Sequence, residues 1–194
     1  MPPSDWRAMS VQPSPYAYTP RVVVNAVNMV HPDVRTIVET LKRKGNQHVF
    51  TYGGMSNGVG QMVGDVGRIA QPGGLYILRI WSHGGSGGQG VSTMNGVPAR
   101  GQRAGISLGN WNEIAGSLTR LKPYFDRAGR FELRGCEVGM GFDGDDFLRL
   151  LSRTLGVDVY AAQLPQPIGP ITWAGPVVRM RPDGRRSVGS GPEQ

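Results

Sequence analysis

Residues 75–85 of this 194-residue chain read LYILRIWSHGG, an almost unbroken run of large apolar side chains that stops at Ser82 and His83. A run of this length and composition is typical of a strand that is buried on both faces of a parallel sheet. The glycines that follow it predict a loop. The segment therefore predicts a strand of a parallel sheet over residues 75–81, with His83 just beyond its carboxyl end.

A second segment has the same organisation. Residues 131–139 read FELRGCEVG, so Cys136, the only cysteine of the chain, also follows a short apolar run. In open parallel sheets, ligands bind beyond the carboxyl ends of the strands. Because His83 and Cys136 both stand just past such ends, we expect them at the same edge of the sheet.

Further strands alternate with helices along the chain. Besides the strands at 75–81 and 131–134, apolar or β-branched runs predict strands over residues 21–28, 48–52 and 157–161. The helical spacing of apolar residues predicts helices over residues 31–44, within 53–74, from 111 to about 125, and from Asp145 to 155. Turn-forming residues predict one hairpin over residues 171–188, with its turn at 182–184. The glycine-rich stretch over residues 84–109 predicts a loop or a hairpin. This alternation predicts an α/β fold with a mostly parallel sheet and helices on both faces.

The composition fits one domain. We assign it to residues 21–190, preceded by a flexible N-terminal arm over residues 1–20 that is rich in Pro, Ser and Tyr. No stretch approaches the roughly 20 apolar residues of a membrane span, and the arm does not resemble a signal peptide. A single cysteine forms no internal disulfide. We therefore expect a cytoplasmic protein that does not enter a membrane.

The net charge of +7 raises the question of nucleic-acid binding. The chain has only three lysines, its arginines are spread along the sequence, and the densest cluster, over residues 179–186, has no interleaved aromatic residues. An arginine-rich solvated surface therefore accounts better for the charge. One cysteine with scattered histidines makes no zinc site, and no helical pattern follows the glycines at 85–90 as a dinucleotide site requires. We expect neither a metal nor a cofactor.

Cysteine and histidine together suggest a nucleophile and its acid–base partner. A thiol attacks as the thiolate, which needs a neighbour that accepts or delivers a proton. All three histidines, His31, His48 and His83, precede Cys136, and His83 does so by 53 residues. Gly84 and the amide of Cys136 are candidate donors to an oxyanion. Taken singly, a buried structural thiol and a loop histidine remain the alternatives for Cys136 and His83.

Three segments resemble the caspase-like cysteine peptidases, the group of caspases, metacaspases, gingipains and separases. They are LYILRIWSHGG at 75–85, FELRGCEVG at 131–139 and GDDFLRLLSRTLGVDVYAA at 144–162. The most similar pattern is that of a bacterial caspase-like domain with Ser-His-Gly, present here at 82–84, and Gly-Cys-x-Val, present at 135–138. The resemblance implies a caspase-like three-layer sandwich and a cysteine endopeptidase that uses the pair His83 and Cys136. The caspase signature Gln-Ala-Cys-x-Gly is absent, which leaves the substrate preference open.

Arg134, two residues before Cys136, is a candidate for substrate binding. Residues two apart on a strand share a face, so Arg134 is expected near the side chain that precedes the scissile bond. Metacaspases carry Asp and caspases carry Gln at this place. Arginine grips carboxylates with paired hydrogen bonds, which predicts a preference for Asp or Glu before the cut. The alternative is that Arg134 pairs with Glu132 or Glu137 within the protein.

The sequence thus predicts a cysteine endopeptidase that cleaves extended peptide segments of a protein or peptide substrate, including segments of its own chain. A catalytically silent caspase-like module that binds a partner protein is the first alternative. An arginine-rich nucleic-acid binder is the second.

Overall fold

The computed structural model describes residues 20–28, 33–52, 58–89, 105–167 and 172–193. Residues 1–19 of the predicted arm and His31 lie outside the described residues, as does the part of the glycine-rich stretch over residues 90–104. Within the described residues no helix is long and apolar enough to cross a membrane.

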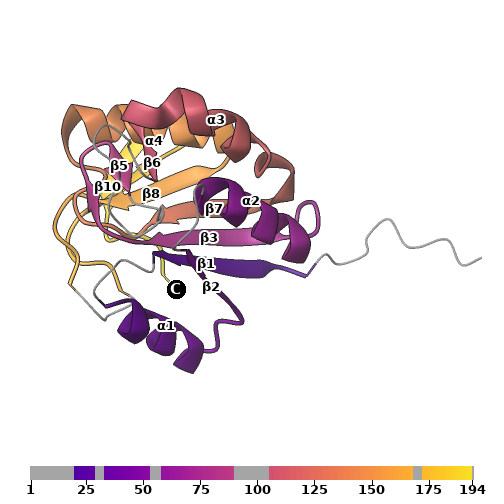
Figure 1. The fold of residues 1–194 in the computed structure, drawn as a ribbon. Coiled ribbons are helices and arrows are strands. Elements are labelled where there is room, and N and C mark those ends of the chain that lie inside the picture. Colours follow the sequence, from indigo (N-terminus) through magenta and orange to yellow (C-terminus); the bar gives the residue numbers. More distant parts are fainter. Residues whose placement is uncertain (1–19, 29–32, 53–57, 90–104, 168–171, 194) are drawn as a thin grey trace, which may run out of the picture.

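The centre of the fold is a seven-stranded sheet with the strand order β10-β9-β8-β7-β3-β1-β2 (Figure 1). The strands β1, β2, β3, β7 and β8 run parallel to one another, whereas β9 and β10 are antiparallel to their neighbours. The bounds are Val22–Asn28 for β1, His48–Tyr52 for β2, Leu75–Trp81 for β3, Phe125–Leu133 for β7, Asp158–Ala162 for β8, Val177–Met180 for β9 and Arg186–Gly189 for β10. The predicted mostly parallel sheet is confirmed.

Helices cover both faces of this sheet, as predicted. Helix α1 (Val34–Arg43) lies on one face, and α2 (Gly58–Ile69), α3 (Trp111–Thr119) and α4 (Gly141–Leu155) lie on the other (Figure 1). The elements therefore form three layers.

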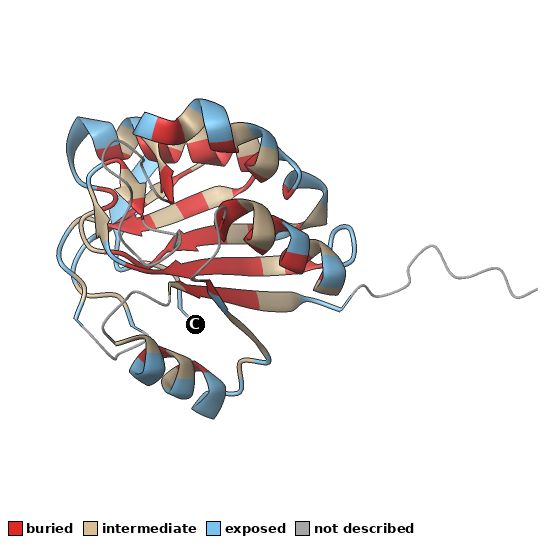
Figure 2. Cartoon of the chain, in the orientation of Figure 1, coloured by how far each residue is buried: buried red, intermediate tan, exposed pale blue. Residues whose placement is uncertain are grey.

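The core is divided by the sheet into two parts. Leu78, Ile80 and Leu133 point from β3 and β7 into the larger cluster, which they share with α2, α3 and α4. Val27 and Trp81 point the other way and pack with α1. Figure 2 shows the sheet largely buried and the outer sides of the helices exposed. The alternating directions of side chains along β3 explain why its sequence is apolar on nearly every residue.

Among the predicted boundaries that differ from the structure, three are displaced by four residues or more inside the elements around the site. Helix α3 ends at Thr119 rather than near residue 125, because Pro123 has no N–H to continue the helical hydrogen bonds, and Lys122–Tyr124 form a short 3-10 helix instead. Strand β7 begins at Phe125, six residues before the predicted start, where charged residues and Gly129 interrupt the apolar pattern. Helix α4 begins at Gly141, so Asp145 lies inside it and does not open it.

The glycine-rich stretch after β3 forms a small second sheet. It contains β4 (Gly84–Gly85), β5 (Gly88–Gln89) and β6 (Ile106–Ser107), paired antiparallel in that order. The hairpin alternative is therefore confirmed for residues 84–89. The C-terminal hairpin of β9 and β10 is also confirmed.

Candidate active site

The register of β3 and β7 brings the two predicted catalytic segments to one sheet edge. Ile80 of β3 lies opposite Leu133 of β7, and the Arg134 N–H donates to the Ile80 carbonyl oxygen at 2.8 Å. His83 and Cys136 each stand three residues beyond this matched pair. The expectation that both follow the carboxyl ends of strands at one edge is confirmed.

This edge is also where the strand order changes direction. The chain passes from β1 to β2 on one side and continues to β3 on the other side of β1. In open α/β sheets the crevice at such a switch point is the usual place for a ligand. Here the last residue of β1, Asn28, donates from Nδ2 to Oγ of Ser82 at 2.8 Å, which ties the switch point to the residue before His83.

Glycines allow the turn after β3 to approach the turn after β7. A Cβ atom added to Gly84 would collide with the side chain of Val138 and lie 2.8 Å from the carbonyl oxygen of Cys136. Only a residue without a side chain permits this approach. The amides of Gly84 and Cys136, both predicted as oxyanion donors, therefore belong to main-chain segments in van der Waals contact.

The side chain of a buried glutamine packs against the same turn. Gln89 of β5 donates from Nε2 to the carbonyl oxygen of Ile80 at 2.7 Å, and its side chain also fills the space beside Gly135. The residue is only 3% exposed. Gln89 thus links the hairpin that follows His83 to the end of β3.

Cys136 is half-buried, and its sulfur contacts the segment that follows β8. The N–H of Gln166 donates to Sγ over an N–S distance of 3.3 Å, and the thiol faces the Gln166 carbonyl oxygen at 3.9 Å. The next residue, Glu137, has φ 56°, the one positive φ outside glycine among the described residues. Such conformations cost on the order of 1–3 kcal/mol and are concentrated at functional sites.

His83 differs from Cys136 in its exposure. The residue lies between β3 and β4 and is exposed, whereas Cys136 is half-buried in the turn that follows β7. A solvent-accessible imidazole at the same sheet edge as a shielded thiol can exchange protons with water while the thiol contacts a ligand.

Arg134 is engaged within the protein. Its guanidinium donates to Oε2 of Glu132 from Nε at 2.9 Å and from Nη2 at 2.7 Å. Trp173 covers it, with 3.7 Å between the guanidinium carbon and the ring centre, and its side chain is 3% exposed. Burial lowers the pKa of Arg134 to about 10, so it stays charged at neutral pH. Of the two alternatives for Arg134, the structure shows the pairing with Glu132, and a contact with substrate stays a prediction.

Glu132 holds two more arginines in the same layer. Arg79 donates to Oε2 at 2.9 Å and Arg130 donates to Oε1 at 2.6 Å. Burial acts to raise the pKa of Glu132, but the three cations around it outweigh burial and hold the pKa below its usual value. A single buried carboxylate therefore organises three arginines on the face of the sheet opposite α2, α3 and α4.

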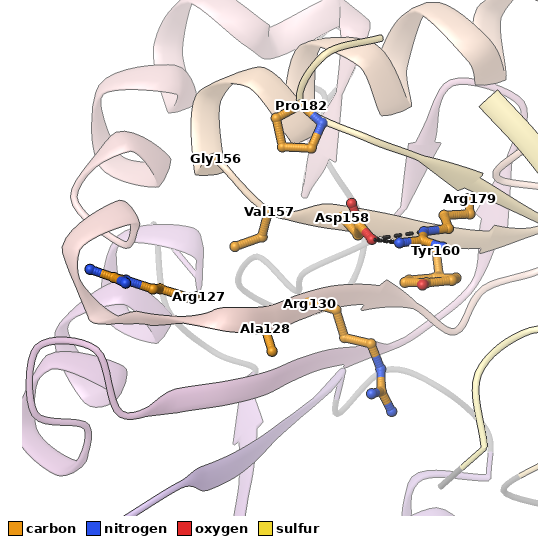
Figure 3. A pocket seen from close by; sticks show the side chains of 10 residues that line it. Arg127, Ala128, Arg130, Gly156, Val157, Asp158, Tyr160, Arg179 and Pro182 are labelled. Carbon is orange, nitrogen blue, oxygen red and sulfur yellow. Dashed lines mark hydrogen bonds and ion pairs between the residues drawn. The ribbon is translucent and has the colours of Figure 1, made fainter. Parts of the chain in front are cut away.

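A pocket of about 420 Å³ lies elsewhere, toward the amino ends of β7 and β8 (Figure 3). Its charged side chains include the pair of Arg179 and Asp158, joined at 2.7 Å between Nε and Oδ2. It is lined by Arg127, Ala128, Gly129, Arg130, Gly156, Val157, Asp158, Tyr160, Arg179 and Pro182. No histidine or cysteine lines it, so it offers none of the predicted nucleophilic chemistry.

Searches for known relatives give no assignment, since no family model, curated protein or solved structure matches the chain at a significant level. Within the described part of the chain, no group of three His, Cys, Asp or Glu is arranged to hold a metal ion.

Sequence reasoning did not identify Asn28, Gln89 or Gln166. Asn28 carries the same signal that identified His83, because it is a polar residue at the carboxyl end of an inner strand. Gln89 lies in the two-residue strand β5 and Gln166 lies in a loop, where no apolar pattern marks them. Gln166 contacts Cys136 through its main chain, which no residue type reveals.

Proposed function

We propose that the protein is a caspase-like cysteine endopeptidase, with Cys136 as nucleophile and His83 as general acid and base. The observation that carries the proposal is the equal offset of the two residues beyond the matched pair of Ile80 and Leu133 on neighbouring parallel strands. The close approach of Gly84 to Cys136 and the positive φ of Glu137 add support. The predicted cytoplasmic location stays a prediction.

The reaction divides into two steps. In the first, the Cys136 thiolate attacks the scissile carbonyl carbon, and the amides of Gly84 and Cys136 donate to the developing oxyanion. The C–N bond then breaks, and protonated His83 gives its proton to the departing amine. In the second, water attacks the thioester and gives a proton to His83. The C–S bond breaks, which releases the carboxylic acid and restores the thiolate.

A protein-binding module without catalysis is the second candidate, favoured by exposed apolar side chains at the same edge. Met140 is 42% exposed, Phe142 is 91% exposed and Leu164 is 48% exposed. Met140 and Phe142 follow Cys136, and the Leu164 carbonyl accepts from the Glu137 N–H at 3.3 Å. Exposed apolar groups that gather at one place mark surfaces that contact another protein or a ligand. This candidate would be favoured if Phe142→Ser lost the binding of a partner protein while Cys136→Ala bound that partner as tightly as wild type.

The nucleic-acid alternative has less support. Nine arginines of the described chain form ion pairs with carboxylates, which leaves less positive charge for phosphates.

Cleavage itself tests the proposal. The purified full chain is incubated alone and with a mixture of unstructured peptides, and new termini are identified by mass spectrometry. Wild type and His48→Ala should produce fragments, because His48 begins β2 at the amino edge of the sheet. Cys136→Ala and His83→Ala should produce none. Fragments that persist in Cys136→Ala, or their absence with wild type, would contradict the proposal.

A further inference from the structure

Gln166 presents its main chain to the Cys136 thiol. Its N–H donates to Sγ over 3.3 Å, while its carbonyl oxygen lies 3.9 Å from the same sulfur. The N–H contact is the shorter of the two, so the sulfur meets a donor more closely than an acceptor. A donor at sulfur stabilises the thiolate over the thiol, because the negative charge strengthens the hydrogen bond.

The side chain of Gln166 fixes that main chain in place. Its Nε2 donates to the carbonyl oxygens of Leu164 at 3.0 Å, Pro165 at 3.3 Å and Ala174 at 2.9 Å. Its Oε1 accepts from the N–H of Ala174 at 3.0 Å. One carboxamide thus joins the segment after β8 to the segment before β9.

The turn that carries Cys136 is tied to the same segment. The Glu137 N–H donates to the Leu164 carbonyl oxygen at 3.3 Å, and the Gly139 N–H donates to the Ala162 carbonyl oxygen at 2.9 Å. Hydrogen bonds therefore hold both the turn that carries the sulfur and the segment that carries the Gln166 N–H.

We propose that Gln166 is a positioning residue: its side chain holds its own N–H on the Cys136 sulfur, where the N–H stabilises the negative charge of the attacking thiolate. The inference rests on the proposed peptidase function, in which Cys136 is the nucleophile. It concerns the thiol itself, however, and is measured without a substrate.

Alkylation of the only cysteine tests the inference. Iodoacetamide reacts with the thiolate, so its rate at pH 7 reports the thiolate of Cys136 alone. Gln166→Ala should react about tenfold more slowly, the effect of losing one hydrogen bond to a charged group, and its pH profile should move to higher pH. Gln166→Glu should act in the same direction, because a carboxylate cannot donate to the three carbonyl oxygens.

Gln163→Ala is the matched control, since Gln163 lies in the same segment and its side chain is not part of this set of hydrogen bonds. It should react like wild type, and all variants should react alike in denaturant. Circular dichroism and thermal unfolding check the fold; if Gln166→Ala does not fold, Gln166→Glu, which keeps the size of the side chain, decides.

An unchanged rate in the folded Gln166 variants would overturn the inference. A faster rate would also overturn it, because the segment would then shield the thiol rather than activate it. If alkylation depends on Gln166 but wild type cleaves no peptide, the inference stands and the proposed function fails. If wild type cleaves peptides and the alkylation rate is the same in the Gln166 variants, the proposed function stands and the inference fails.

Discussion

Gly135 and Gly84 lie so close that a Cβ atom added to Gly135 would come within 3.0 Å of the Gly84 Cα. The two glycines belong to the turns that follow β7 and β3, which are the turns that carry Cys136 and His83. The packing of main chain against main chain therefore holds the segment after His83 against the segment before Cys136.

Substitution of Gly84 by alanine should lower both stability and activity. Its methyl group would meet the Cys136 carbonyl oxygen at 2.8 Å, and main chain cannot move away as a flexible side chain can. We expect a loss of about 1–3 kcal/mol in the free energy of unfolding. Gly85→Ala is the control, because a Cβ there meets nothing within 4 Å. Equal effects at the two positions in chemical denaturation would contradict this account of the packing.

Glu132→Gln should be strongly destabilising. The change leaves Arg79, Arg130 and Arg134 in a buried layer without their carboxylate, and removal of one partner from a buried ion pair costs about 3–5 kcal/mol. Asp183→Asn, which removes the exposed partner of Arg185, should have no measurable effect. Urea unfolding at neutral pH compares the two. Similar midpoints for Glu132→Gln and wild type would show that the network does not stabilise the fold.

The same carboxylate predicts a dependence of stability on pH. Because the three arginines hold the pKa of Glu132 below its usual 4.5, its contribution is complete above the pKa of the unfolded chain. It is lost as the pH falls through the lowered folded value. Unfolding free energies measured between about pH 6 and pH 3 should therefore fall less steeply in Glu132→Gln than in wild type. Parallel curves would contradict the charged state assigned to Glu132.

A substitution of Arg134 can distinguish a role in stability from a role in substrate binding. Its pairing with Glu132 and its cover by Trp173 indicate a role in stability. Arg134→Ala should therefore lower the melting temperature while the residue preferred before the cut, profiled with a peptide library, stays the same. Loss of a preference for Asp or Glu in this variant would instead support the predicted contact between Arg134 and a substrate carboxylate.

The strands were predictable where apolar or β-branched residues follow one another. Residues 75–81 and 48–52 form β3 and β2 at the predicted bounds. The start of α4 was not predictable, because the helical spacing of apolar residues begins only at Phe147, six residues after the helix itself begins. That His83 and Cys136 lie at one edge of the sheet was predictable from the two strand ends alone.

The partners of these residues required the tertiary structure. Arg134 directly follows β7 and stands two residues after Glu132, so their pairing was an open alternative. Arg79 and Trp173, by contrast, come from distant segments. The contact of Gln166 with Cys136 spans 30 residues and uses main-chain atoms, for which the sequence holds no signal.

Labelling of Cys136 by a peptide with an electrophilic end group is the most direct test of the proposed pair. The full chain is treated at neutral pH, and the rate of labelling is followed by mass spectrometry for wild type, His83→Ala and His48→Ala. We expect selective labelling of Cys136 in wild type and His48→Ala, and labelling about a hundredfold slower in His83→Ala. Labelling of wild type only in denaturant, or an equal rate in His83→Ala, would contradict a catalytic pair of His83 and Cys136.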